Sequence, residues 1–490
     1  MTKQDLDYIF NPESVAVVGV SSRGLGMQMG GSSYMESLLA CKFQGRIYPV
    51  NPKGGEFQGL RIYPNIKDIP EPVDYVICSI SAQQIPELLQ DCAVKGVKTM
   101  QIYTGGFSDS GTEEGKQLEK KLSALARQYG IRLLGPNCVG IYHPEVGLAY
   151  YSDFPQESGS AALICQSGGN SGHIVREAAM RGVRFSKVIS FGNACDINES
   201  DLLEYLTTSE DTKVIAAYIE GVKDGKRFSR VLKEAARAKP VIVLKGGMTE
   251  AGTRAAASHT GSLAGSNKVW DGLLRQVGAI KVCSLEELLD MLVTFSLLPL
   301  PLGKKAGILG WGGGISVLAA DDFINAGLMI PEFPKEVQDK LESCLEKGNV
   351  GVSLGNPVDI SDQAFGDPAY TCTKIMFDYE GLDLLIYHMA ADIGHLPPPD
   401  KLDAGLSLMA TSTIKAYRES GKPLAVVIPF SSLPYIQECT TKVKQIYSEA
   451  GIPIYHSLGS AAKAIARFIN YYERRPAKKQ AQIRVPSLSF

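Results

Sequence analysis

A single histidine stands in a stretch of small residues, Ala-Ala-Ala-Ser-His-Thr-Gly-Ser-Leu-Ala-Gly, at positions 255–265. This residue, His259, is one of six histidines in the chain of 490 residues. A core histidine is usually packed by bulky apolar residues and a metal-binding histidine usually has a second ligand nearby, and the surrounding sequence supplies neither. Small neighbours let another backbone or a ligand approach, and neutral imidazole accepts phosphoryl groups near pH 7. Taken alone, the stretch is more typical of an alanine-rich helix that ends in a polar cap.

A glycine-rich segment follows the first apolar run and predicts a binding loop. The spacing Gly24-Leu-Gly26-Met-Gln-Met-Gly30 is GxGxxxG, which differs from the GxGxxG of dinucleotide-binding folds and is weak evidence alone. The next apolar run ends in Asn51-Pro52-Lys53, where such folds have an acidic residue for the ribose hydroxyls. A lysine suits a ribose that carries a phosphate, as NADP and coenzyme A do. The alternative is a structural turn with a solvated lysine.

Two more turns follow apolar runs in the same region, Tyr-Thr-Gly-Gly-Phe at 103–107 and Gly-Pro-Asn-Cys-Val-Gly at 135–140. If these runs are parallel strands, both turns lie at the carboxyl edge of one sheet, where ligands bind. Asn137 could hydrogen-bond a ligand there, or it could be a turn residue that bonds its own backbone. The residues themselves leave both interpretations open.

The composition is that of a globular protein, with 44% hydrophobic and 21% charged residues. A formal net charge of −2 argues against bulk electrostatic binding to nucleic acid or to a membrane. The first residues lack the basic and apolar regions of a signal peptide, and the most apolar stretch, 288–303, is too short and too broken to span a bilayer. The ten cysteines are scattered without CxxC spacing, which suits a reducing compartment, so we expect a cytoplasmic protein.

One pattern occurs three times and predicts the elements that position these residues. An apolar strand runs into a Gly/Ser loop and then into a helix-like segment at 15–26, 161–172 and 305–316. Other short apolar runs alternate with helical stretches such as 115–130 and 226–238, which implies parallel sheets with helices on both faces. These runs lie at 46–51, 74–80, 98–104, 213–221, 239–247, 382–390 and 424–430. The fold class expected is α/β, with three doubly wound parallel-sheet domains of Rossmann or flavodoxin type.

Turn and proline residues cluster near 143–160 and 296–305, which predicts the domain boundaries. The three domains are expected at 1–145, 146–300 and 301–470. A basic tail follows at 471–490 and is expected to be a flexible end or a partner contact.

The ordered set of motifs resembles the α subunit of ADP-forming acyl-CoA synthetases, also called NDP-forming acetate–CoA ligases, in the succinyl-CoA synthetase superfamily. The resemblance runs from about residue 8 to about residue 465. It rests on GVSSRGLG, YPVNPK, YTGGF, GPNCVG, CQSGGNSG, SFGNACDI, YIEGV, ASHTGSLAG and GNPVDI. It implies that the first domain binds coenzyme A, that the second carries a phosphorylated histidine on a mobile loop, and that the third is flavodoxin-like.

The resemblance also assigns residues and partners. The phosphohistidine falls on His259, the glutamate that supports its ring on Glu220, and the phosphate contacts on Ser167, Gly168 and Asn137. A separate ATP-grasp β subunit is implied, which would bind Mg-ADP or Mg-ATP, in an α2β2 assembly. The expected coenzyme A contacts are Gly19, Ser21, Ser22, Arg23, Gly24, Gly26, Lys53, Ser79, Ser81, Thr104 and Gly105.

Two segments depart from the pattern of relatives. Many have Lys-Ser-Gly-Arg where this chain has Lys245-Gly246-Gly247-Met248, and Trp311 stands where relatives often begin Thr-Asn. These departures concern acyl specificity and third-domain contacts more than the central chemistry.

The expected activity is acyl-CoA + phosphate + ADP ⇌ carboxylate + coenzyme A + ATP. Two alternatives are a coenzyme A-binding regulatory protein without turnover, for which His259 and Glu220 would be superfluous, and an NADP-linked oxidoreductase, for which no hydride-transfer site is evident. His388 and His395 lie seven residues apart and a metal site would need further ligands at defined spacing, so no metal is expected.

Overall fold

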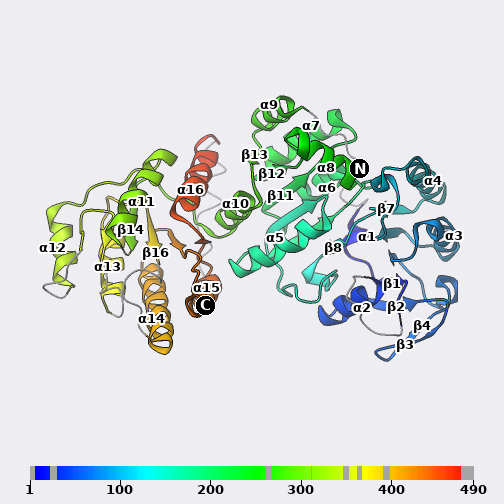
Figure 1. The fold of residues 1–490 in the computed structure, drawn as a ribbon, viewed down its shortest axis with the longest axis horizontal. Helices are drawn as coiled ribbons and strands as arrows, with labels where there is room; N and C mark the ends of the chain where they lie inside the picture. Colours follow the sequence, from blue (N-terminus) through cyan, green and yellow to red (C-terminus); the bar gives the residue numbers. More distant parts are fainter. Residues whose placement is uncertain are drawn as a thin grey trace. The chain divides into compact units, whose positions relative to one another are not determined.

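The computed structural model describes residues 6–21, 30–260, 266–310, 312–345, 352–360, 367–389 and 398–475. These residues form three mainly parallel sheets flanked by helices, together with a small hairpin, β3–β4 (Figure 1). The chain divides into two compact units. One contains residues 1–176 and 184–288, and the other contains residues 177–183 and 289–490. The α/β fold class predicted from the sequence is confirmed.

The first sheet has the strand order β2-β1-β5-β6-β7, and all its neighbouring strands are parallel. Alternate side chains point to opposite faces, so Ala16, Val18, Val76 and Cys78 pack with α3 and α4 in one core cluster. The strands are β1 (Ser14–Val18), β2 (Arg46–Val50), β5 (Tyr75–Cys78), β6 (Thr99–Ile102) and β7 (Arg132–Leu134), with β3 (Gly55–Phe57) and β4 (Leu60–Ile62) beside them. The helices are α1 (Asp7–Phe10), α2 (Gly31–Ala40), α3 (Ile85–Lys95) and α4 (Glu113–Tyr129), with the short turns η2 (Ile66–Asp68), η3 (Ala82–Gln84) and η4 (Ser108–Ser110).

The second sheet has the order β13-β12-β11-β9-β10-β8, in which only the edge strand β8 is antiparallel to its neighbour. Its strands are β8 (Gly140–Tyr142), β9 (Ala161–Cys165), β10 (Phe185–Ser190), β11 (Val214–Ile219), β12 (Val241–Lys245) and β13 (Ile280–Val282). Its helices are η5 (Pro144–Val146), α5 (Gly168–Met180), α6 (Glu199–Thr208), α7 (Gly225–Ala238), α8 (Glu250–Thr260) and α9 (Asn267–Val277). Helix α10 (Leu285–Leu297) begins at the end of this unit, and most of its residues belong to the other unit. The predicted boundary at residue 145 stays a prediction; β8, which precedes it, pairs with the second sheet.

The third sheet has the order β15-β14-β16-β17-β18 and is parallel throughout. On one side α11 packs against α16, and on the other α13, α14 and α15 pack in sequence over an apolar cluster of this unit (Figure 1). The strands are β14 (Ala306–Gly310), β15 (Val358–Asp359), β16 (Leu384–His388), β17 (Leu424–Val427) and β18 (Ile454–Tyr455). The helices are α11 (Gly313–Ala326), α12 (Lys335–Ser343), α13 (Asp367–Asp378), α14 (Pro399–Arg418), α15 (Pro434–Glu449) and α16 (Leu458–Glu473).

The expected loop at His259 is wrong. Residues Glu250–Thr260 form α8, so His259 lies in the last turn of a helix. Alanine has the highest intrinsic helix propensity of all residues. The run Ala255-Ala256-Ala257 therefore favours a helix and outweighs the loop-like character of the small residues that follow. The helical alternative considered for this stretch describes the backbone correctly.

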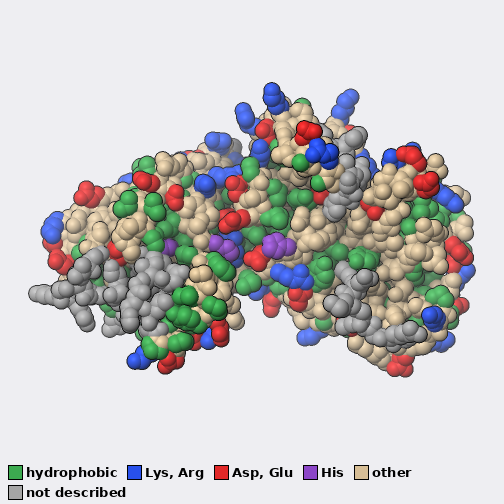
Figure 2. Space-filling model, viewed as in Figure 1, with side chains coloured by type: hydrophobic (Ala, Val, Ile, Leu, Met, Phe, Trp, Pro, Cys, Tyr) green, Lys and Arg blue, Asp and Glu red, His purple; other side chains and the backbone are tan. Residues whose placement is uncertain are grey.

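Two further features concern the charge of the surface and the hydropathy of the helices. On the face shown in Figure 2, acidic and basic side chains are interspersed. Within the part of the chain that the structure describes, no helix combines the length and the hydropathy needed to cross a bilayer.

A buried ion pair holds the third-sheet unit together. Arg181 is 1% exposed; its Nη2 donates to Asp290 at 2.6 Å and its Nε donates to the carbonyl oxygen of Ile454 at 2.8 Å. Asp290→Ala would leave the guanidinium buried without its counter-charge, so we expect the free energy of unfolding of this unit to fall by about 3–5 kcal/mol. Urea denaturation measures this. Asp378→Ala, which removes an exposed pair with Lys374, is the control and should cost less than about 0.5 kcal/mol; equal effects would contradict the assignment.

Candidate active site

The strand order of the first sheet places a binding position between β1 and β5. The chain leaves β1 toward β2 on one side and later returns to β5 on the other side, and ligands of doubly wound sheets bind at such a switch point. Gly19 follows β1 with φ of 102°, and a Cβ there would collide with the carbonyl oxygen of Ser79, which follows β5. The close approach of these two strand ends therefore requires glycine at position 19.

A cavity of about 440 Å³ opens at this edge of the sheet. Three short segments line it: Ser79–Ser81 after β5, Tyr103–Gly105 after β6, and Asn137. The Thr104 hydroxyl donates to the carbonyl oxygen of Ile80 at 2.6 Å, and the backbone N–H of Asn137 donates to the carbonyl oxygen of Thr104 at 3.1 Å. Four of the expected coenzyme A contacts, and the asparagine whose role the sequence left open, thus share one cavity. The four are Ser79, Ser81, Thr104 and Gly105.

Lys53 lies in an exposed turn directly after β2. Its backbone N–H donates to the side-chain oxygen of Asn51 at 2.9 Å, and the Asn51 amide donates to the carbonyl oxygen of Val20 at 2.7 Å. Asn51 therefore ties the turn that carries Lys53 to the segment after β1. Ser21 belongs to that segment, and its backbone N–H donates to the Ser32 hydroxyl at 3.0 Å. The expected contacts Ser22, Arg23, Gly24 and Gly26 lie outside the described residues.

The second sheet has its own switch point, between β9 and β11. Ser167 follows β9 and Glu220 follows β11, so the two residues expected to hold phosphate and to support a histidine lie beyond adjacent strand ends. Gln166 connects them, because its side-chain oxygen accepts hydrogen bonds from the backbone N–H groups of Glu220 and of Gly221, the latter at 3.0 Å. Gln166 and Glu220 are both 3% exposed.

Helix α5 begins at Gly168, immediately beyond β9. The first backbone N–H groups of a helix have no partner within the helix and carry partial positive charge, which makes this end suitable for an anion. A Cβ on Gly168 would lie 2.9 Å from Val139, so this helix start packs closely against the segment that follows Asn137. The expected phosphate contacts Ser167, Gly168 and Asn137 are therefore neighbours along one edge of the same unit.

Lys245, at the end of β12, adds a buried cation beside Glu220. It is 5% exposed, and its ammonium group donates to the carbonyl oxygen of Glu220 at 2.7 Å and to that of Gly246. Burial lowers the pKa of Lys245, whereas the charge of Glu220 opposes this shift. Burial also raises the pKa of Tyr218, with the charge of Glu220 and a hydrogen bond from Tyr218 to it as further causes. Glu220 thus lies close to both a phenol and an ammonium group.

The helix that carries His259 packs near a segment that follows the cavity-lining residues in the chain. Helix α8 contacts η4, which follows the cavity residue Gly105 by three residues. The side chain of His259 lies outside what the structure describes. The end of β12, α8 and the cavity residues belong to a single compact unit.

The loop 191–197 joins the carboxyl edges of the first two sheets. A Cβ on Gly192 would collide with the carbonyl oxygens of Pro136 and Asn137, so this loop lies directly on the cavity segment. The Asn193 amide nitrogen donates to Asp109 at 2.8 Å and to Glu119 at 2.9 Å. The two switch points are therefore held at a fixed spacing by packed backbone and by buried polar bonds.

Sequence reasoning missed three residues of this arrangement. Gln166 and Asn193 were part of the quoted motifs but received no role, and Lys245 was noted only as part of a departure from relatives. A signal existed for Gln166, since a polar residue at the end of a fully buried strand needs a partner.

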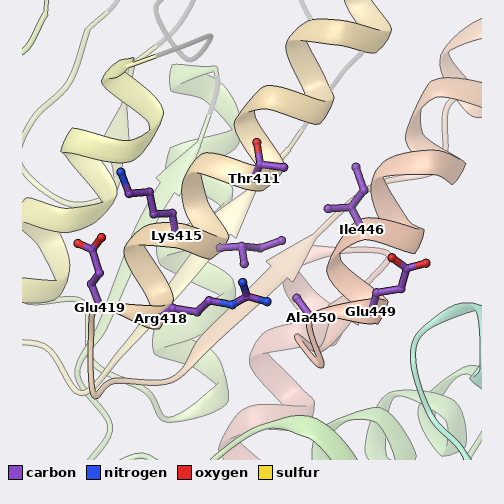
Figure 3. Close-up of a pocket in the computed structure, with 8 residues that line it drawn as sticks. Thr411, Lys415, Arg418, Glu419, Ile446, Glu449 and Ala450 are labelled. Carbon is purple, nitrogen blue, oxygen red and sulfur yellow. The ribbon is translucent and has the colours of Figure 1, made fainter. Parts of the chain in front are cut away.

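A second cavity, of about 410 Å³, lies between α14 and α15 in the other unit (Figure 3). Arg418, Lys415 and Glu449 are among its lining residues. Because α14 follows β16 and ends before β17, its last turn lies at the amino ends of the strands. That is the edge opposite to the one where doubly wound sheets bind ligands, so we assign this cavity no role in the chemistry.

Comparison with known proteins decides the family. A CoA binding domain matches residues 13–144, and a succinyl-CoA ligase-like flavodoxin domain matches residues 158–295. The chain is 36% identical over 465 residues to the α subunit of acetate–CoA ligase [ADP-forming] II of Pyrococcus furiosus, covering 94% of this chain and 96% of that one. The chain is an α subunit of the ADP-forming acyl-CoA ligase family.

Two further relatives extend this comparison. The acetate–CoA ligase [ADP-forming] of Methanocaldococcus jannaschii is 39% identical over 362 residues, which is 74% of this ligase subunit and 50% of that protein. The dinucleotide-forming acetyl-coenzyme A synthetase 1 of Ca. Korarchaeum cryptofilum, solved with phosphate and ADP, aligns with a TM-score of 0.79 and 29% identity over 97% of this chain and 98% of that chain. The ligase subunit is thus an enzyme with a coenzyme A-binding domain, and its membership among α subunits implies a partner subunit. Its site residues remain predictions.

Proposed function

We propose that this subunit performs the acyl-transfer and phosphohistidine steps of acyl-CoA + phosphate + ADP ⇌ carboxylate + coenzyme A + ATP. Three features of one compact unit support the proposal. These are the start of α5, Glu220 at the adjacent strand end, and α8, which carries His259 and contacts η4. The relatives' names supply the ADP-forming ligase class.

The proposed reaction proceeds in three steps. Phosphate attacks the thioester carbonyl, the C–S bond breaks, and coenzyme A leaves as an acyl phosphate forms. A ring nitrogen of His259 then takes the phosphoryl group and releases the carboxylate. Finally ADP takes the phosphoryl group from the histidine and gives ATP. An acyl phosphate is needed because a free carboxylate is a poor electrophile toward a thiol at neutral pH.

Each residue of the edge has a defined part in these steps. The backbone N–H groups after Ser167 hold the phosphate oxygens and stabilise the charge that develops on them. Glu220 accepts a hydrogen bond from the ring nitrogen that is not phosphorylated, fixes the tautomer and stabilises imidazolium character. Gln166 positions Glu220 by binding its backbone N–H and that of Gly221. Because α8 carries His259, the histidine moves with a helix end in this mechanism.

The nucleotide step belongs to a partner in this proposal. An ATP-grasp β subunit binds Mg-ADP or Mg-ATP, and the two kinds of subunit assemble as α2β2. The phosphoryl group then has to travel between domains, which is the task of the phosphohistidine.

Phosphate labelling tests the mechanism. The purified subunit, with and without an ATP-grasp partner, is mixed with radiolabelled phosphate and a panel of acyl-CoAs. We expect acid-labile label on the protein that depends on one acyl-CoA and disappears in His259→Ala. The absence of label in the presence of the partner and of every acyl-CoA would overturn the catalytic assignment and favour a coenzyme A-binding protein without turnover.

Lys53 provides a test of the coenzyme A site. We expect Lys53→Ala to weaken coenzyme A binding by roughly tenfold, because one charge-assisted contact to phosphate is lost. Binding of dephospho-coenzyme A, which lacks the ribose phosphate, should be unchanged by the same substitution. Titration calorimetry measures both affinities.

Lys98→Ala is the matched control for Lys53→Ala. Lys98 is also an exposed lysine of the first domain, and its ammonium group lies 3.5 Å from Asp74. Lys98→Ala should leave the affinities for coenzyme A and for dephospho-coenzyme A unchanged. If Lys53→Ala weakened the two ligands equally, the lysine would not read the ribose phosphate.

A further inference from the structure

A buried histidine with a vacant ring nitrogen lies away from the active site, just after β8. His143 is 2% exposed, and its backbone is fixed by hydrogen bonds in both directions with Leu148. Its Nδ1 lies 2.9 Å from the carbonyl oxygen of Phe10. A carbonyl oxygen only accepts hydrogen bonds, so Nδ1 carries the hydrogen and Nε2 keeps its lone pair. Among the described residues Nε2 has no hydrogen-bond partner.

Two carboxylates from separate segments meet this nitrogen. Glu145 Oε2, in η5, lies 3.7 Å from Nε2, and Asp211 comes from the turn between α6 and β11. One ligand atom from each of His143, Glu145 and Asp211 lies within 4.8 Å of the others. A metal-ligating histidine commonly donates its second ring nitrogen to a backbone carbonyl, which is the arrangement that Phe10 provides.

The charges around the cluster favour a cation. A cavity of about 510 Å³ adjoins it and is lined by four carboxylates, those of Asp7, Glu145, Glu210 and Asp211. The basic residue in this lining is Lys187, whose ammonium group pairs with Asp211.

We propose that His143, Glu145 and Asp211 bind a divalent transition-metal ion, Zn²⁺ being the ion tested. One imidazole nitrogen and two carboxylate oxygens make a suitable set of three protein ligands, which leaves a position for water. Zinc–ligand bonds of about 2.0–2.2 Å put ligand atoms roughly 3.3 Å apart, so the 3.7 Å between His143 and Glu145 needs a small movement. The Glu145 side chain is 66% exposed and is free to make it.

The ion would cross-link three distant parts of the unit. His143 and Glu145 follow β8, Asp211 precedes β11, and the Nδ1 bond connects the cluster to the end of α1. The proposed role is structural, because the cluster lies beside β8 and α1 and not at the carboxyl ends of β9 and β11. Binding would therefore raise the melting temperature without being needed for turnover.

Zinc titration of the chelator-treated full chain tests the proposal. Competition against a colorimetric zinc indicator should reveal one saturable site per chain, and Mg²⁺ should not occupy it, since Mg²⁺ prefers all-oxygen ligands. Glu145→Gln and His143→Gln should each weaken this site at least about tenfold. Glu145→Gln changes an exposed side chain, so its metal-free melting temperature should equal that of the wild type and separate loss of a ligand from loss of folding.

Glu210→Gln is the matched control. Glu210 lines the same cavity and is exposed, but it is not one of the three ligands, so it should retain the affinity within about twofold. The melting temperature of the wild type should rise on adding zinc, and that of Glu145→Gln should not. Zinc binding of equal strength in the wild type and in both ligand variants, or no saturable binding by the wild type, would overturn the proposal.

Discussion

His259→Ala should reduce ATP formation from acyl-CoA, phosphate and ADP by about 10⁴-fold or more, to the background of the assay. Removal of a covalent nucleophile costs roughly this much in other enzymes, because no neighbouring group can take its place. The release of coenzyme A from acyl-CoA in the presence of phosphate should persist, since that step precedes phosphoryl transfer to the histidine. A thiol assay and an ATP assay on the same sample measure the two steps separately.

His173→Ala is the control for this loss. His173 is an exposed residue on α5, one turn beyond the proposed phosphate site, and should leave both steps within about twofold of the wild type. The mechanism would be contradicted if ATP formation survived in His259→Ala, or if His173→Ala caused the same loss.

Glu220→Gln should lower the rate of phosphoryl transfer through the histidine by about 10²–10⁴-fold. Glutamine keeps the size of the side chain and leaves the backbone N–H that binds Gln166, but it removes the charge that stabilises the imidazolium. The effect should fall on the rate of histidine labelling and not on the affinity for coenzyme A. Rapid-quench measurement of acid-labile label gives this rate.

The matched control is Glu234→Gln. Glu234 is an exposed glutamate of α7, and its carboxylate lies 3.5 Å from Arg230. Its neutralisation should change neither labelling nor affinity. If the histidine of the Glu220→Gln enzyme is labelled at the wild-type rate, the Glu220 carboxylate has no catalytic role.

The fold could be predicted because its signals are local. Runs of buried β-branched and aliphatic residues, such as those at 213–221 and 239–247, became β11 and β12, and the helical stretches at 115–130 and 226–238 became α4 and α7. The antiparallel strand β8 was missed because it has three residues and its partner β10 begins more than forty residues later. A strand this short has no periodicity to detect.

The grouping of site residues was predictable in part. Glycines and polar residues after strands mark carboxyl edges, and this signal predicts Thr104 and Asn137 at one sheet edge, where both line the cavity. Ser79 was expected only from the family resemblance. Strand order could not be predicted, so the position of Ser167 beside Glu220 at a switch point is a product of tertiary structure. At His259 the local signal was the better guide. Helix propensity predicts the backbone correctly there, and the loop expected from the function was wrong.

The cluster at His143 shows why a metal was not expected. His388 and His395 are close in sequence, whereas the proposed ligands combine a local pair, His143 and Glu145, with Asp211. The third ligand, Asp211, lies in the turn between α6 and β11, far from the local pair in sequence, so spacing along the chain does not indicate it.

The pairing of β8 with β10 determines where recombination between related subunits can occur without disturbing the second sheet. Gly140–Tyr142 follows the cavity segment without a linker, yet these residues complete the second sheet. Recombination between two relatives at residue 145 would give the second sheet an edge strand from a foreign parent, and the segment that ends at His143 would come with it. After a crossover just before Gly140, each of the two sheets would consist of strands from a single parent. Gene shuffling of coenzyme A-binding halves should therefore yield folded hybrids more often when the join precedes β8.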